Sequence, residues 1–268
     1  MNMDTSSVLS AKDISFSHTG KEELFSHLSF TLPKGEFTVL AGSNGCGKST
    51  LLRILAGFLP VSAGEVLLHG SPIHSFSRKR KKPGFVPQEL PEAEEMTVRE
   101  LVLTGLLAGK GLFPFATGKE KAKVQEILEE LDLTHLAQRR CASLSGGEFR
   151  RAAIGMSLVR SPEILLLDEP CSSLDYGHAQ SLMLFLQKMC RKHFLTILMV
   201  SHDLILPAKY ATNFVLMKKG EIFAEGAPEK VLTKENLEEV YHIPFEVLSS
   251  QKNFPVPIPA DRETPPQQ

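Results

Sequence analysis

Long apolar runs, net charge and cysteines are all scarce in this chain of 268 residues. Nowhere do about 18 apolar residues follow one another, as a membrane-spanning helix requires. Residues 1–12 also lack the basic and apolar regions of a signal peptide. We therefore expect that the chain does not cross a membrane by itself. The formal net charge of −1 gives no general attraction to nucleic acid or acidic lipid, so we expect no nucleic-acid partner.

The few cysteines point to a reducing cytosol. Cys46, Cys141, Cys171 and Cys190 show no C-x-x-C spacing, and a disulfide at Cys46 would block the loop described next. Residues 78–82 are the one local run of cations, but no aromatic side chains that stack on bases are interleaved with them. We expect this run to be a solvated surface loop.

The most informative segment fits the phosphate-binding pattern G-x-x-x-x-G-K-[ST]. It follows the apolar residues 37–41 and opens a helical pattern over residues 49–56, so its glycines bring backbone N–H groups and a helix N-terminus onto phosphate oxygens. Lys48 would reach the β- and γ-phosphates, and Ser49 would ligate Mg²⁺. We call this segment the phosphate loop; it consists of Gly42, Ser43, Asn44, Gly45, Cys46, Gly47, Lys48, Ser49 and Thr50.

The chain before and just after this loop is typical of short strands. Residues 8–40 and 65–69 predict a small antiparallel sheet that leads into the loop. Residues 97–107 and 119–133 carry apolar residues at helical spacing, which indicates a helical insertion over residues 89–141.

Beyond the insertion, strands alternate with a helix. Apolar runs at 164–167 and 195–200 flank a helical stretch at 177–192, and this order predicts a parallel sheet. Residues 213–217 and 221–224 predict a hairpin at the sheet edge. The proline-rich residues 251–268 predict a disordered tail.

Polar residues follow two of these strands, as the phosphate loop follows a third. Asp168 and Glu169 come after residue 167, and His202 comes after residue 200. In an open parallel sheet, ligands bind at the edge formed by the carboxyl ends of the strands. Asp168 suits Mg²⁺, which prefers one or two carboxylates with phosphate oxygens. Glu169 suits the orientation of an attacking water, and His202 is a candidate for contact with the γ-phosphate.

Residues 144–148, Leu-Ser-Gly-Gly-Glu, precede another helical pattern; we call them the LSGGE turn. Ser145 and Glu148 have the spacing of a capping box, so a simple helix start is one interpretation. That interpretation leaves Gly146 and Gly147 unexplained, because glycine in a helical turn costs up to about 1 kcal/mol relative to alanine. The alternative is a second anion site, where backbone N–H groups approach the anion closely.

In this order, these motifs resemble the ATP-binding-cassette (ABC) ATPases. The likeness rests on the phosphate loop, Gln88, the LSGGE turn, residues 164–170, residues 173–175 and residues 200–203. It implies an α/β fold, with a P-loop NTPase core built on a mainly parallel sheet, a small antiparallel β subdomain and an inserted helical subdomain. The expected ATPase domain spans residues 7–248, with the insertion at 89–141 and the tail at 249–268.

The resemblance also implies roles for single residues. Two chains of such an ATPase sandwich two ATP molecules head to tail, with Ser145 and Gly147 on the γ-phosphate bound by the other chain. Gln88 would help to place Mg²⁺ and water, His202 would hold the γ-phosphate, and Asp175 would communicate across the dimer. ATP and Mg²⁺ are the implied cofactors, because phosphoryl transfer needs mainly positioning and charge neutralisation.

Two positions depart from the family pattern. His18 stands where a tyrosine usually stacks on adenine, with Phe16 as the nearby substitute. Cys46 replaces a small residue, and we expect it to make the loop sensitive to alkylation.

Within the family, the likeness is greatest to ATPases of bacterial importers for iron siderophores, haem and cobalamin. It implies a membrane permease, an extracytoplasmic substrate-binding protein and a peripheral position on the cytoplasmic face of the inner membrane. Zinc or manganese importer ATPases share much of the pattern. The opposed hypothesis is a soluble ABC ATPase, such as an iron–sulfur assembly factor or a translation factor. Translation factors usually carry two cassettes in one chain, whereas this chain has one. An exporter would usually carry a fused membrane domain.

Overall fold

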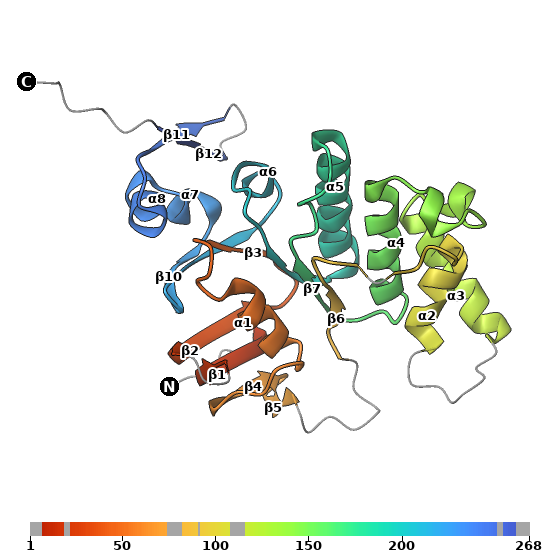
Figure 1. The fold of residues 1–268 in the computed structure, drawn as a ribbon, viewed down its shortest axis with the longest axis horizontal. Helices are drawn as coiled ribbons and strands as arrows, with labels where there is room; N and C mark the ends of the chain where they lie inside the picture. The colour runs from red at the N-terminus through yellow and green to blue at the C-terminus, as the bar shows by residue number, and fades with distance from the viewer. Residues whose placement is uncertain are drawn as a thin grey trace, which may run out of the picture.

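A six-stranded sheet forms the centre of the computed structural model, which describes residues 7–18, 22–73, 82–90, 92–107, 116–250 and 254–260 (Figure 1). The strand order is β10-β9-β3-β8-β7-β6, with every pair parallel except β10 and β9. This arrangement confirms the predicted parallel sheet and its edge hairpin. The strands are β3 (Phe37–Gly42), β6 (Gly84–Val86), β7 (Ile164–Asp168), β8 (Thr196–Val200), β9 (Asn213–Lys218) and β10 (Glu221–Gly226).

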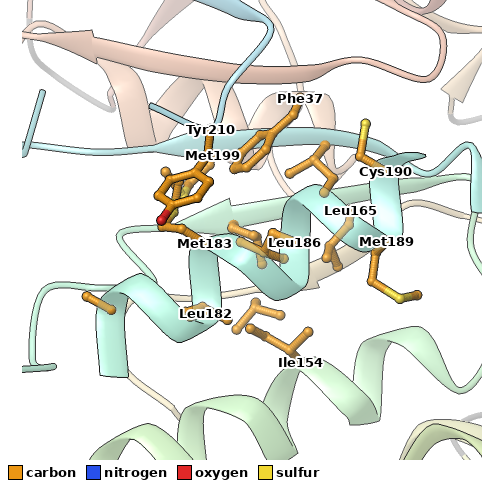
Figure 2. Close-up of a cluster of buried hydrophobic side chains, with 14 of the residues drawn as sticks. Phe37, Ile154, Leu165, Leu182, Met183, Leu186, Met189, Cys190, Met199 and Tyr210 are labelled. Atoms are coloured by element: carbon orange, nitrogen blue, oxygen red, sulfur yellow. The ribbon is translucent and has the colours of Figure 1, made fainter. Parts of the chain in front are cut away.

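The inner strands of this sheet are buried on both faces, which explains their continuous apolar sequences. Val39 and Leu165 belong to one hydrophobic cluster, whereas their neighbours Leu40 and Leu166 belong to the other. Helix α1 (Lys48–Leu55) packs in the second cluster. Helix α5 (Tyr176–His193) packs in the first, between the sheet and Ile154 (Figure 2). The sheet edge that holds the functional residues is therefore fixed from both sides.

The predicted antiparallel sheet lies beside α1, and its strand order is β2-β1-β4-β5 (Figure 1). Its apolar side chains, including Phe25 and Ile14, share the second cluster with α1. The sheet therefore supports the helix that follows the phosphate loop. Its strands are β1 (Ser7–Ser17), β2 (Glu23–Pro33), β4 (Ala63–Leu68) and β5 (Ser71–Pro72).

The predicted helical insertion lies at the far end of the molecule from this antiparallel sheet (Figure 1). Helix α4, which begins after residue 141, packs with the two predicted helices, so the helical unit includes the helix that follows the LSGGE turn. The unit contains α2 (Val98–Leu107), α3 (Gly118–Glu130), the 3-10 helices η2 (Thr134–Leu136) and η3 (Cys141–Ser143), and α4 (Gly146–Leu158).

The C-terminal part corrects one prediction. Residues 255–259 form strand β12 (Pro255–Pro259), which pairs antiparallel with β11 (Phe245–Ser249), so the expected disorder is wrong for this segment. Its prolines alternate with Val256 and Ile258, which keep their N–H groups for pairing. Residues 251–253 and 261–268 lie outside the described residues. Three short helices precede the hairpin: α6 (Ile205–Ala208), α7 (Pro228–Val231) and α8 (Lys234–Tyr241).

Some sequence-based expectations remain predictions. The domain limits at residues 7–248 and the insertion limits at 89–141 are of this kind. Residues 78–81 of the basic run lie outside the described residues. In the described part of the chain, no helix has the length and apolar character needed to cross a bilayer.

Candidate functional site

The phosphate loop joins the end of β3 to the start of α1, as the sequence predicts. Gly47 has φ 104°, and a Cβ atom there would lie 2.5 Å from the ring of Phe25 on β2. Only glycine fits this backbone conformation so close to an aromatic ring. As the N-cap of α1, Gly47 offers no side-chain oxygen, and the helix start carries no side-chain cap. The first N–H groups of α1 are therefore open to a bound anion.

Lys48 binds backbone carbonyls of the loop to which it belongs. Its side chain is buried, and Nζ donates to the carbonyl oxygens of Gly42 at 2.9 Å and Ser43 at 3.0 Å. A buried ammonium requires several acceptors, and these two carbonyls supply them without a carboxylate. The charge of Lys48 therefore stays at the loop, where it can meet phosphate oxygens.

Cys46 is buried beneath the loop rather than displayed on it. Only 4% of the residue is exposed, and burial raises the pKa of its thiol. Low exposure and a protonated thiol both reduce reactivity. The expected sensitivity of this loop to alkylation therefore has no support in the structure.

Two of the three residues predicted to hold magnesium, Ser49 and Asp168, lie in contact, and the third, Gln88, lines the same pocket as Ser49. Ser49 Oγ donates to Asp168 Oδ1 at 2.8 Å, while the buried Oδ2 of Asp168 has no hydrogen-bond partner among the described residues. A buried, unpartnered carboxylate oxygen beside a hydroxyl matches the few hard oxygen ligands that Mg²⁺ takes from proteins. No cluster of three or more His, Cys, Asp or Glu side chains suited to a metal occurs in the described segments. The hydroxyl of Ser49 and the carboxylate of Asp168 therefore fit Mg²⁺.

Glu169 lies between two of the other predicted catalytic side chains, His202 and Gln88. Its Oε1 is 2.5 Å from His202 Nε2, and its Oε2 accepts from Gln88 Nε2 at 3.0 Å. The carboxylate side chain is only 10% exposed. Glu169 also has φ 47°, a left-handed conformation that costs free energy in a residue other than glycine. The two polar partners hold this carboxylate at the carboxyl edge of the sheet, and the surrounding structure maintains the strained backbone beneath it.

A pocket of about 540 Å³ lies over these groups. Its lining brings together parts of the chain that are distant in sequence. The sequence predicts this, because the polar residues that follow three parallel strands meet at one edge of the sheet. Of the phosphate-loop residues, Gly42, Ser43 and Cys46 lie outside the lining, and Asp168 reaches the site through Ser49. The lining residues are His18, Leu24, Asn44, Gly45, Gly47, Lys48, Ser49, Thr50, Gln88, Glu169 and His202.

The pocket separates the two candidates for adenine contact. His18 is exposed and lines the pocket. Phe16 is 7% exposed and packs near Phe25, with its ring edge-to-face against His18 at 5.0 Å. Because Phe16 is enclosed by the core, it has no free face for a base, and His18 is the better candidate.

The LSGGE turn begins α4 and lies outside this pocket. Ser145 Oγ accepts from the Glu148 backbone N–H, and Glu148 Oε2 accepts from the Ser145 backbone N–H at 2.7 Å, so the predicted capping box is present. The bond from the Ser145 N–H holds the pKa of Glu148 below its ordinary value. This turn therefore contributes nothing to the nucleotide pocket of its own chain.

The two glycines of the LSGGE turn differ. A Cβ atom at Gly147 would lie 2.8 Å from the ring of His178, whereas one at Gly146 would meet nothing closer than 3.8 Å. Gly147 is therefore explained by packing within the chain. Gly146 has open space where a side chain would stand.

Asp175 forms the N-cap of α5 beside this turn. Its Oδ1 accepts from the His178 backbone N–H at 2.9 Å, and its Oδ2 lies 2.6 Å from His178 Nδ1. The hydrogen bond from the backbone N–H lowers the pKa of Asp175. Asp175 does not line the pocket, so its predicted role across a dimer remains a proposal.

Sequence reasoning missed two residues that matter here. Leu24 of β2 lines the pocket, but nothing distinguishes it from other apolar strand residues. Arg150 of α4 is 4% exposed and donates to the backbone of the segment that carries Gln88. The Arg150-Arg151 pair gave no sign that one member is buried.

Comparison with known proteins places this chain in a family. The model of the family "ABC transporter" matches residues 25–172. The ferric enterobactin transport ATP-binding protein FepC of Escherichia coli strain K12 is 33% identical over 249 residues, which cover 92% of each chain. The hemin import ATP-binding protein HmuV of Hahella chejuensis is 39% identical over 237 residues, covering 84% of this chain and 89% of HmuV.

Solved structures agree in fold. A chain described as part of a metal-chelate type ABC transporter in an inward-facing conformation has TM-score 0.83 and 27% identity, covering 96% of this chain and 98% of its own. The bacterial ABC transporter cassette MJ0796, solved as a dimer, has TM-score 0.70 and 26% identity, covering 82% and 98%. The chain therefore belongs to the ABC transporter family and is one of its ATPases.

Proposed function

We propose that this chain is the ATP-hydrolysing subunit of an importer that takes up an iron chelate, namely an iron siderophore or haem, or cobalamin. The observation that carries the proposal is the placement of Glu169 between Gln88 and His202, beside a loop that presents Lys48 and Ser49 to the same pocket. The names of the relatives support the iron-chelate or haem cargo. An ATPase subunit does not itself touch the cargo, so the cargo rests on likeness alone.

The chain supplies positioning and charge to phosphoryl transfer. Lys48 and the open N–H groups of α1 bind the phosphates. Ser49 and Asp168 would hold Mg²⁺, which when bound would neutralise part of the phosphate charge. Glu169 accepts a hydrogen bond from the attacking water and orients it, while His202 and Gln88 fix the carboxylate. His202 is half exposed, so it can also reach the γ-phosphate.

A second copy of the chain completes the site. The LSGGE turn has open backbone at Gly146, yet it lies outside the pocket of its own chain. A head-to-tail dimer brings this turn of one chain onto the γ-phosphate bound by the other. Ser145 and the Gly146 and Gly147 N–H groups would then contact the phosphate, with Asp175 close to the partner.

The permease contact lies on the helical unit. Gln88 follows the edge strand β6, and α4 packs against β6 from the helical unit. A cytoplasmic helix of a membrane permease would dock beside Gln88, so that dimer closure moves the permease. The chain would then be peripheral on the cytoplasmic face of the inner membrane, with an extracytoplasmic substrate-binding protein on the other side. A zinc or manganese importer remains the alternative cargo class.

The test is to tag the chain in its native cell, solubilise the membranes gently and identify its partners by mass spectrometry. We expect a polytopic permease and a substrate-binding protein. The purified binding protein is then screened against ferric siderophores, haem, cobalamin, Zn²⁺ and Mn²⁺. Recovery with cytosolic partners alone would contradict the import function and favour a soluble ABC ATPase. Preferential binding of Zn²⁺ or Mn²⁺ would contradict the iron-chelate assignment.

A further inference from the structure

Arg150 is a buried cation on the helix that follows the LSGGE turn. Its guanidinium donates through Nη1 to the Pro87 carbonyl at 2.9 Å and through Nη2 to the Gln88 carbonyl at 2.8 Å. Both terminal nitrogens therefore bind successive carbonyls of one segment. The planar fork of arginine suits this geometry, whereas the point charge of lysine does not.

No carboxylate in the described segments forms an ion pair with Arg150. Its guanidinium interacts electrostatically with the thiol of Cys171, and burial raises the pKa of that thiol to about 11, so the thiol is neutral near pH 7. A buried charge without an ion pair is costly unless it is well hydrogen-bonded. The two carbonyls thus stabilise Arg150, and any displacement of the Pro87-Gln88 segment must move Arg150 or break these bonds.

A second bond ties the same two elements together. Ser157 lies two helical turns after Arg150 on α4, and its hydroxyl donates to the Phe85 carbonyl at 3.0 Å. Positions seven apart share one face of a helix, so this face of α4 holds three carbonyls of the β6 segment. Of these two α4 side chains, Arg150 is the one that binds the end of the segment that carries Gln88.

Gln88 is thus held at both ends. Its side chain donates to Glu169 in the nucleotide pocket, and its carbonyl accepts from Arg150. Arg150 lies in the second turn of α4, directly after the turn that begins at Ser145. A continuous path of two hydrogen bonds and one helical turn therefore joins Glu169 to the LSGGE turn.

We propose that Arg150 is a positioning residue that ties Gln88 to the first turn of α4. A shift of Gln88 during nucleotide binding is then passed to the LSGGE turn as that turn meets the partner's nucleotide. This inference rests on the proposed dimeric ATPase, and it assigns to Arg150 the coupling between the pocket of one chain and the surface that the chain presents to its partner.

The test compares Arg150→Lys with Ser157→Ala, each in the full chain carrying Glu169→Gln so that ATP is not consumed. Ser157→Ala is the matched control, because it removes an α4 bond to the same segment but not at Gln88. We measure ATP affinity by fluorescence at dilute protein, ATP-driven dimerisation by light scattering, and thermal melting. For Arg150→Lys we expect ATP affinity within about twofold of the parent and dimerisation weakened about tenfold, the size of one lost charged hydrogen bond. Ser157→Ala should change neither the ATP affinity nor the dimerisation.

Equal dimerisation of Arg150→Lys and the parent would overturn the proposal, as would an equal loss in Ser157→Ala. If Arg150→Lys does not fold, hydrogen exchange in the parent decides instead. Amides of residues 88–90 and 146–150 should change over the same range of ATP concentration, and separate ranges would overturn the coupling. A parent that neither binds ATP nor dimerises would contradict the proposed function itself, and this result is distinct from a failure of Arg150.

Discussion

The phosphate loop and the LSGGE turn both end in a helix N-terminus, but they differ in how that N-terminus is satisfied. α1 starts at Gly47 without a side-chain cap, and it has Lys48 beside it in a pocket. α4 starts at Ser145 with a capping box closed by Glu148, an acid, and it lies outside the pocket over the phosphate loop. The first site can bind an anion by itself. The second has a carboxylate within its cap, so we expect it to add to binding only after another surface has captured the nucleotide.

The largest effect should come from Glu169→Gln, which removes the base but keeps the shape and polar contacts of the side chain. We expect hydrolysis to fall by about 10²–10⁴-fold, the usual contribution of a positioned acid-base group, while ATP binding persists. ATP should then trap a dimer, visible by size-exclusion chromatography. Hydrolysis at the parent rate would show that another group orients the water.

Next in size, Lys48→Ala should separate the two anion sites. We expect ATP affinity to fall at least about a hundredfold, because charged hydrogen bonds to the phosphates are lost. Ser145→Ala is the comparison, and it should leave the ATP affinity of dilute chains unchanged. Fluorescent nucleotide titration measures both. If both variants lost affinity equally, the LSGGE turn would already contribute within one chain.

A smaller effect is expected from Gly147→Ala. The new methyl group meets the His178 ring, and such overpacking typically costs about 1–3 kcal/mol of stability. Gly146→Ala has open space and should be neutral or slightly stabilising in a melt, yet should still weaken ATP-driven dimerisation. Adding His178→Ala to Gly147→Ala should restore stability. No rescue would mean that the clash with His178 is not the cause.

The smallest effect concerns the acid in the capping box. Because the Ser145 N–H lowers the pKa of Glu148, the folded chain holds the ionised form more strongly than the unfolded chain. The resulting stability is present above the unfolded pKa of about 4.3 and is lost as pH falls through the lower folded pKa. We expect Glu148→Gln to cost at most about a few tenths of a kcal/mol at pH 7 after solvent screening. Urea titrations should show this difference vanishing as pH falls through the lowered folded pKa, and a constant difference would contradict it.

Much of the site could be predicted because its residues follow strands in recognisable patterns. The order of β3, β7 and β8 placed the phosphate loop, Asp168 and His202 at one edge, and the adjacent strands bear this out. The contacts between the site elements could not be predicted in the same way. His178 against Gly147, and Arg150 on Gln88, are tertiary contacts that no spacing encodes.

The error at the C-terminus has a similar cause. Many prolines and few large apolar side chains predicted disorder there. The alternation of Pro255, Pro257 and Pro259 places the prolines at every second position, opposite Ser249, Val247 and Phe245. The composition of the segment does not show this alternation, whereas the positions of the prolines in the sequence do.

The left-handed backbone of Glu169 has a consequence for how this sequence can change. A non-glycine residue in this region costs about 1 kcal/mol, so a chain selected for heat resistance alone would gain by glycine or asparagine at position 169. Either change would remove the carboxylate that Gln88 and His202 hold. At position 169, conformational stability and ATP hydrolysis therefore favour different residues. In a descendant that no longer hydrolyses ATP, we expect glycine or asparagine to replace Glu169 early.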